Sequence, residues 1–174
     1  MMNKDKEIQE LLAKVKAAEK GEKLDLSSGE DLSVAVMNLI SIEEHLFFTF
    51  GKTKKEGYLE LLNQVREMRK GLLKKLIKDY EGEEWCLSKH LLAGSMRLLE
   101  VGTKSLSKGD KKEAKEYFQM AHSLYELFWG LNLKLLKTGD LEKTVEKEIE
   151  NDSTHSFMAK LGEVIKKAID CCRE

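Results

Sequence analysis

One apolar stretch of this chain, residues 31–50, carries a stripe of polar side chains that could bind a ligand. At about 100° per residue, a helix would place these groups on one side: Asn38, Ser41, His45 and Thr49, with Glu44 at the edge. Buried polar groups need partners, and Arg97 is the cation best suited to reach Glu44. The stripe predicts either a polar network that fixes helix register or a small pocket for an anionic or polar ligand. The predicted pocket residues are Asn38, Ser41, Glu44, His45 and Arg97.

A metal site is a second hypothesis. Cys86 and His90 stand four residues apart, which puts both on one face of a helix and could supply two zinc ligands. His122 could be a third ligand if its helix lies alongside, and His45 is a further candidate. No Glu-x-x-His pair occurs, so a di-iron bundle site is not expected. The alternative is that these are ordinary core or surface side chains.

Positive charge is concentrated in two places. Residues 52–80 hold nine basic and four acidic residues, and residues 104–115 hold a second cluster of lysines. If both clusters share one face, they could neutralise phosphates of RNA. The predicted contacts are Arg66, Arg69, Lys70, Lys74, Lys111 and Lys112. Few arginines and no interleaved aromatic residues accompany these lysines, so a solvated helix surface is the competing interpretation.

Signatures of catalysis are missing from the sequence. It contains no Gly-rich phosphate loop, no Gly-x-Ser-x-Gly elbow, no His-Glu-x-x-His and no Cys-x-x-Cys. The formal net charge is −1, so the whole molecule favours neither a polyanionic nor a polycationic partner. We therefore expect a non-enzymatic protein with no catalytic residues and no cofactor.

Long helices must position all of these groups. The 174 residues include no proline, and no stretch alternates as a strand would. Apolar periodicity and glycine stops predict helices over residues 4–20, 31–50, 53–80, 83–107 and 110–137, a short acidic helix over 141–150, and an amphipathic helix over 157–172. Capping boxes at 27–30, 53–56 and 110–113 mark three of the starts.

The short connections predict an all-α antiparallel bundle of about five long helices plus the short acidic helix. We expect residues 1–26 to form a loosely docked N-terminal amphipathic helix and linker, and residues 27–174 to form the bundle as a single domain. Because residues 31–50 are apolar nearly all the way round, we expect their helix to be the buried centre.

Small residues recur every seven positions in the stretch 83–107, at Ser88, Ser95 and Gly102. Such a ridge allows another helix to approach closely. Packing against the next helix of the same chain is the expected use, and self-association is the alternative.

The turn that follows the ridge carries a family resemblance. The residues that carry the resemblance lie in the turn and in the helices on both sides of it. They are, in order, Gly102, Gly109, Asp110, Ala114, Phe118 and Ala121. The hairpin resembles a tetratricopeptide repeat, and less closely the carboxy-terminal helices of translin-type RNA-binding proteins. Tetratricopeptide repeats stack in arrays with helices of about a dozen residues. This hairpin occurs once with longer helices, so the resemblance implies shared helix-packing rules and a TPR-like hairpin.

Three functions remain open on the sequence. The first is protein-protein contact, as a scaffold, an adaptor or a homo-oligomer, and nucleic-acid binding and an internal ligand or metal site are the alternatives. A cytoplasmic location is expected, because the start of the chain lacks an apolar signal region and the three cysteines are an odd number. No membrane partner is expected, since the uncharged stretch 32–42 spans only 11 residues.

Overall fold

The computed structural model describes residues 9, 10, 12, 13, 16, 26–77, 83–136 and 161–165. Every regular element in these ranges is a helix, which confirms the all-α class. The main helices are α2 (Leu26–Thr53), α3 (Gly57–Leu76), α4 (Glu83–Ser107) and α5 (Lys111–Asn132). Residues 161–165 are also helical. The expected helix over 141–150 and most of those over 4–20 and 157–172 lie outside the described residues.

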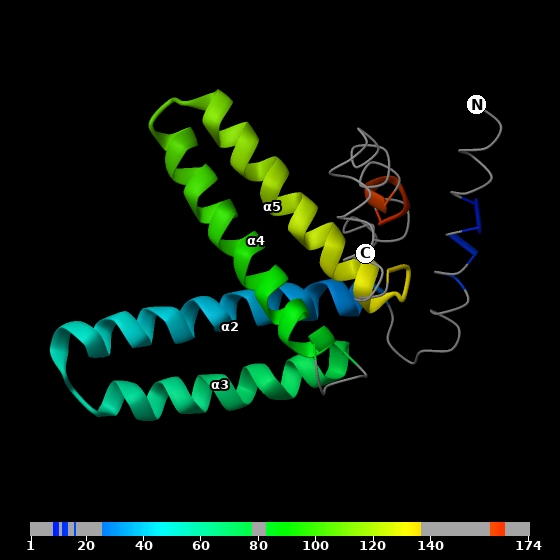
Figure 1. Ribbon diagram of the computed structural model, residues 1–174. Coiled ribbons are helices and arrows are strands. Elements are labelled where there is room, and N and C mark those ends of the chain that lie inside the picture. Colours follow the sequence, from blue (N-terminus) through cyan, green and yellow to red (C-terminus); the bar gives the residue numbers. More distant parts are fainter. Residues whose placement is uncertain are drawn as a thin grey trace.

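The helices pair into two hairpins (Figure 1). α2 runs antiparallel to α3, and α4 runs antiparallel to α5, with extensive packing inside each pair. α2 also packs on α4, over a shorter region. The two hairpins cross toward the start of α2, and their turns point apart (Figure 1). Antiparallel pairing is therefore seen within each hairpin, but the pairs cross instead of lying side by side as in a simple bundle.

The turn between α4 and α5 follows its predicted chemistry. Asp110 caps α5, because its side-chain oxygen accepts the backbone N–H of Glu113 at 2.9 Å. Gly109 precedes the cap with φ of +85°, a conformation that glycine adopts without the steric cost of a Cβ. This confirms the predicted cap at Asp110, and the predicted bounds of α4 are also confirmed. The reciprocal bond of a capping box is not made, because the backbone N–H of Asp110 donates to Ser105 O and the Glu113 carboxylate accepts from Ser105 Oγ.

The predicted start of α2 and both predicted ends of α3 are wrong. α2 begins at Leu26, so the box at 27–30 lies inside the helix instead of ahead of it. α3 begins after Glu56, which makes no side-chain capping hydrogen bond. α3 also ends earlier than expected, because Ile77 turns to an extended conformation and is buried, with 4% of its surface exposed. Burial of Ile77 in the core outweighs the helical pattern that continues to residue 80.

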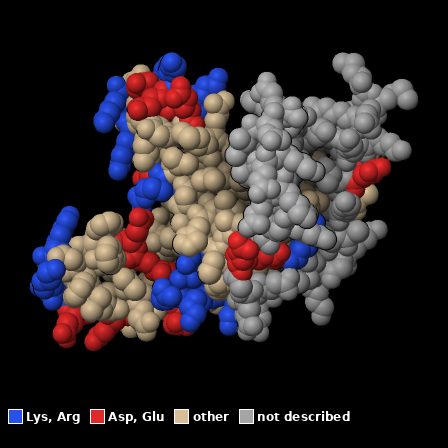
Figure 2. Space-filling view, in the orientation of Figure 1, with Lys and Arg blue, Asp and Glu red and all other residues tan. Residues whose placement is uncertain are grey.

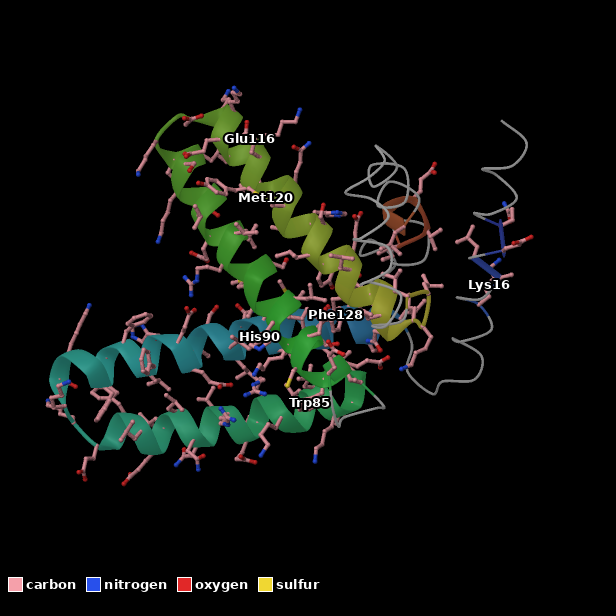
Figure 3. All side chains as sticks on the ribbon, viewed as in Figure 1. Lys16, Trp85, His90, Glu116, Met120 and Phe128 are labelled. Atoms are coloured by element: carbon pink, nitrogen blue, oxygen red, sulfur yellow. The ribbon has the colours of Figure 1, made fainter. Side chains whose placement is uncertain are left out.

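The core lies where the hairpins cross. Side chains from every main helix meet there: Val36, Leu73, Leu92, Phe128 and Trp129 are almost completely buried. Phe128, labelled in Figure 3, stands on α5 close to the crossing with α2 and α4. The apolar faces of both hairpins are thus joined into one cluster, which fixes the angle between them.

Small residues allow α4 and α5 to approach each other. A Cβ added at Gly102 would stand 2.6 Å from Cε1 of Phe118, so only glycine fits. Ser95 Oγ donates to the carbonyl oxygen of Ala121 at 2.8 Å. Ser88 is also buried. The ridge is therefore used within the chain, as expected. Among the residues of the tetratricopeptide resemblance, Gly102 packs against Phe118, Ala114 and Ala121 are buried, and Gly109 and Asp110 form the turn.

The expectation that α2 is the buried centre is wrong. Its buried residues are Gly29, Ser33, Val36, Met37 and Leu46. Large apolar side chains in its second half are exposed, with Phe47 at 58% and Phe48 at 57%. The cause is the crossing of the hairpins: the end of the α2–α3 pair projects beyond α4, so only α3 covers it (Figure 1).

The length of α2 also matters. Among the described residues it is the one helix whose length and composition would allow it to cross a membrane. The uncharged stretch considered from the sequence is only part of this helix of 28 residues. Core helices of proteins outside membranes can have the same length and composition, so these two properties alone do not identify a membrane-spanning helix.

Candidate functional site

An open cleft of about 730 Å³ lies between α2 and α4. The side chains around it are Asn38, Ser41, Ile42, Glu44, His45, Phe48, Thr49, Lys52, Met96, Arg97 and Glu100. The five predicted pocket residues are all among them. Figure 2 shows basic and acidic residues close together in the notch between the hairpins. The structure therefore brings the predicted residues together, at the surface and not inside a bundle.

The geometry of α2 explains which residues face this cleft. Its contribution follows the three- and four-residue spacing of one helix face, from Asn38 through His45 to Lys52. Another face of α2 points to α3, where Leu46 is buried and Glu43 binds Arg69. The cleft face is thus the part of α2 that α3 cannot cover. It carries the predicted polar stripe together with exposed Ile42 and Phe48.

The predicted contact between Arg97 and Glu44 is present. Arg97 Nη2 donates to Glu44 Oε2 across the cleft. The expected buried setting is wrong, because the arginine and glutamate side chains are 49% and 43% exposed. An ion pair in water stabilises a fold by about 0–1 kcal/mol, so this pair contributes little to the crossing angle. It does place both signs of charge at the mouth of the cleft.

Two residues of the polar stripe are satisfied by their own helix. Asn38 Nδ2 donates to the carbonyl oxygen of Val34 at 3.0 Å, and Thr49 Oγ1 donates to that of His45 at 2.8 Å. Such bonds to the preceding turn remove the need for a partner helix. The stripe is therefore stable while open to solvent, which explains how it exists without the internal network that the sequence predicted.

The predicted metal ligands are not assembled. Cys86 and His90 are exposed near the start of α4, and neither lines the cleft. His122 stands on α5 with Nδ1 3.0 Å from Oε1 of Glu126. The part of the chain that the structure describes contains no group of three or more residues that could hold a metal ion. Cys86, His90 and His122 therefore do not form the predicted site; Figure 3 labels His90 on α4.

The predicted nucleic-acid contacts separate into different environments. Arg69 is buried, with Nε 2.8 Å and Nη2 3.3 Å from the two carboxylate oxygens of Glu43, so its assignment to a basic surface is wrong. Lys70 binds Glu67 on its own helix at 2.8 Å. Arg66 and Lys74 are exposed on α3, whereas Lys111 and Lys112 begin α5 at the other hairpin's turn. The α3 cations and the α5 lysines therefore belong to different hairpins (Figure 1).

Sequence patterns gave no indication of a buried carboxylate on α5. Glu126 is 9% exposed, and burial raises the pKa of its carboxyl, while the neighbouring His122 acts in the opposite direction. Ser33 on α2 and Tyr125 on α5 share a hydrogen bond of 2.6 Å between their hydroxyl oxygens. Glu126 is covered by Gly162 of the helical residues 161–165, and the Ser33–Tyr125 bond joins α2 to α5, so only tertiary packing could reveal these two environments.

A smaller open groove of about 620 Å³ lies on the α4–α5 hairpin. It is lined by Leu98, Glu116, Gln119, Met120, Ser123 and Leu124. Figure 3 labels Glu116 and Met120 on α5. None of the residues predicted from the sequence lines this groove, and the α2–α4 cleft remains the site with the larger set of polar groups.

Comparison with known proteins adds no assignment. No family model matches the chain, and neither the curated proteins nor the solved structures include one with significant similarity to it.

Proposed function

We propose that this chain is a non-enzymatic binding protein that docks a helix of another polypeptide in the α2–α4 cleft. The observation that supports this most directly is the exposure of large apolar side chains on α2. Ile42 and Phe48 line the cleft and are 44% and 57% exposed. Exposed apolar side chains that cluster beside polar groups mark protein-protein contact sites.

The shape of the cleft favours a polypeptide over a small molecule. Small-molecule sites bury about 70–90% of the ligand surface. This cleft is open, and the side chains at its mouth, Phe48 and Arg97, are about half exposed. A small ligand there would remain largely in water. A helix would cover the cleft along its length and remove both apolar residues from solvent.

The spacing of the cleft residues suits a helical partner. An amphipathic helix meets its receptor through residues at intervals of three, four and seven. α2 presents Ser41, His45, Phe48 and Lys52 at intervals of this kind. The polar members are already hydrogen-bonded to the backbone or lie in water, so a partner could cover the apolar ones without leaving many polar groups unpaired.

Nucleic-acid binding has less support. It requires one continuous basic face, and Arg69 is withdrawn into the fold while the α3 and α5 cations belong to different hairpins. The cleft itself carries Glu44 and Glu100 beside its cations. Phosphates would be repelled by these carboxylates at the point where Lys52 and Arg97 attract them.

Site-specific photocrosslinking tests the proposal. The photoreactive amino acid benzoylphenylalanine replaces Phe48, and in a control protein it replaces Met68 on α3, which is 55% exposed. In extracts of the cells that produce the protein, we expect one discrete crosslinked polypeptide from position 48 that position 68 does not give. Adding Ile42→Asp should remove this product, because the aspartate puts a charge into the contact.

Mass spectrometry then identifies the crosslinked polypeptide, and the purified pair must form the same product. The proposal is wrong if position 48 gives no product, or if positions 48 and 68 give the same set of products.

A further inference from the structure

The cleft residues of α2 are arranged symmetrically about His45. Relative to that residue they stand at −7, −4, −3, −1, 0, +3, +4 and +7: Asn38, Ser41, Ile42, Glu44, His45, Phe48, Thr49 and Lys52. Every position in this set except Glu44 at −1 has a counterpart at the same distance on the other side of His45. It is also the seam along which two helices pack in a coiled coil, with intervals of three and four.

This symmetry suits one partner above others. When two identical helices pair antiparallel about a twofold axis, residue 45 + n of one meets residue 45 − n of the other. Ile42 would then meet the second copy's Phe48, and Ser41 would meet its Thr49. Asn38 would meet Lys52. Apolar residues thus face apolar residues, and polar residues face polar ones.

We therefore propose that the helix docked in the cleft is α2 of a second copy of this chain, paired antiparallel about a twofold axis at His45. This inference rests on the proposed function and identifies the partner. The pairing covers Ile42 and Phe48 twice each, because an isologous interface uses the same patch on both copies. α3 of each copy remains on the outer side, so α2 and α3 of the two copies together form a small bundle of four helices.

Charge along α2 selects the antiparallel direction. The exposed carboxylate of Asp31 stands in its first turns, whereas Lys52 and the following Lys54 and Lys55 stand at its end. In the antiparallel register Lys52 meets Asn38, and Asp31 stands seven residues, roughly 10 Å, beyond that contact, so no lysine faces its own copy. Parallel pairing would place the lysines of both copies together, which is destabilising.

A membrane is a poorer match for the same surface. Insertion of this face would take Glu44, Lys52, Arg97 and Glu100 into hydrocarbon along with Phe48. A second copy instead leaves the charged groups at the rim of the interface, where water still reaches them.

Disulfide trapping tests the register of the pair. In a background with Cys86, Cys171 and Cys172 changed to serine, His45→Cys should form a disulfide-linked dimer, since each residue at the axis faces its own copy. Disulfides need Cβ atoms about 3.5–4.5 Å apart. Phe48→Cys alone should not crosslink, because its own copy lies six residues away along the seam, roughly 9 Å. Mixing Ile42→Cys with Phe48→Cys should restore the linkage.

Sedimentation equilibrium on the full chain gives the oligomeric state. We expect a species of twice 19.9 kDa, and Phe48→Asp should raise the dissociation constant about 100-fold or more without loss of helical circular dichroism. Met68→Asp is the matched control, being equally exposed on α3, and should leave the dimer unchanged. Flotation with anionic phospholipid vesicles checks the membrane alternative, and we expect no binding.

The outcomes separate the two proposals. A monomeric chain that crosslinks a different polypeptide through position 48 overturns the self-pairing and keeps the docking function. A monomer with no crosslink overturns both. If the dimer persists in the Phe48→Asp variant, or if His45→Cys gives no disulfide, the interface lies elsewhere and the proposed register is overturned. Vesicle binding that Phe48→Asp abolishes overturns the self-pairing in favour of a membrane surface.

Discussion

Arg69 and Glu43 form an ion pair that joins α3 to α2, and its removal should destabilise the fold strongly. The two side chains are only 4% and 15% exposed, and two hydrogen bonds of 2.8 and 3.3 Å connect them. Removing one partner of a buried pair costs about 3–5 kcal/mol, because the other charge stays buried without compensation. Glu43 keeps some contact with water, so we expect Arg69→Met to lower the free energy of unfolding by about 3 kcal/mol.

This loss is measurable in thermal and chemical unfolding. For a chain of this size, about 1 kcal/mol shifts the melting temperature by roughly 2–4 °C, so Arg69→Met should lower it by roughly 6–12 °C. Arg66→Met is the control, since Arg66 lies on the same helix and is exposed. Exposed substitutions of this kind stay within about 0.5 kcal/mol of the parent protein.

A double substitution shows whether the buried charge is the cause. Arg69→Met combined with Glu43→Met removes both charges, and the pair of apolar side chains should recover most of the lost stability. Equal stability of Arg69→Met and Arg66→Met would refute the reasoning. Arg69 would then behave as a surface cation, and its place in a nucleic-acid interface would need to be reconsidered.

Three further substitutions probe the core and the helix ends. Gly102→Ala should cost about 1–3 kcal/mol in thermal unfolding, because the added Cβ would stand 2.6 Å from Phe118. Asp110→Ala should cost about 1 kcal/mol and speed amide hydrogen exchange in the first turn of α5, whose N–H it caps. Glu126→Gln tests the raised pKa of that carboxyl: the folded state holds its proton more tightly, so wild-type stability falls as pH rises above about 4.5. The stability gained by the variant should therefore be larger at pH 8 than at pH 4, and an equal gain at both would contradict this.

Local chemistry accounts for the parts of the fold that the sequence predicted well. The bounds of α4 and the cap at Asp110 depend on neighbouring residues, which a sequence displays directly. The end of α3 depends on tertiary contact: the chain leaves the helix where Ile77 enters the core. No residue between 77 and 80 is a glycine or proline, so nothing local marks this stop.

The environment of Arg69 was harder to predict, although a signal existed. Its charge is the same as that of Arg66 and Lys70, and spacing along α3 does not distinguish them. The antiparallel hairpin does: its turn, residues 54–56, is centred on Lys55, and Glu43 and Arg69 stand 12 and 14 residues away, so they are nearly equidistant from it. Residues equidistant from such a turn face each other, so register across the hairpin would have identified the pair.

The candidate site was predictable in its residues and not in its setting. The 100° periodicity of a helix placed Asn38, Ser41 and His45 on one face, and opposite charge linked Glu44 to Arg97. Apolar periodicity shows which residues a helix could bury, but not which neighbour covers them. The number of neighbours depends on the angle at which the hairpins cross, and that angle is set by core residues distant from the stripe.

The same geometry makes stability and docking separable at Phe48. Its side chain is 57% exposed and therefore contributes little to the core, in contrast to Leu46 two residues earlier, which is 9% exposed. Burial of a full aromatic side chain is worth about 1.5–3 kcal/mol, and most of this remains unrealised at Phe48 in a single copy. A partner that covers Phe48 would therefore gain this free energy of burial on association. For this reason a polar residue at position 48 should leave the fold intact and act on docking alone, whereas the same change at position 46 should act on the fold.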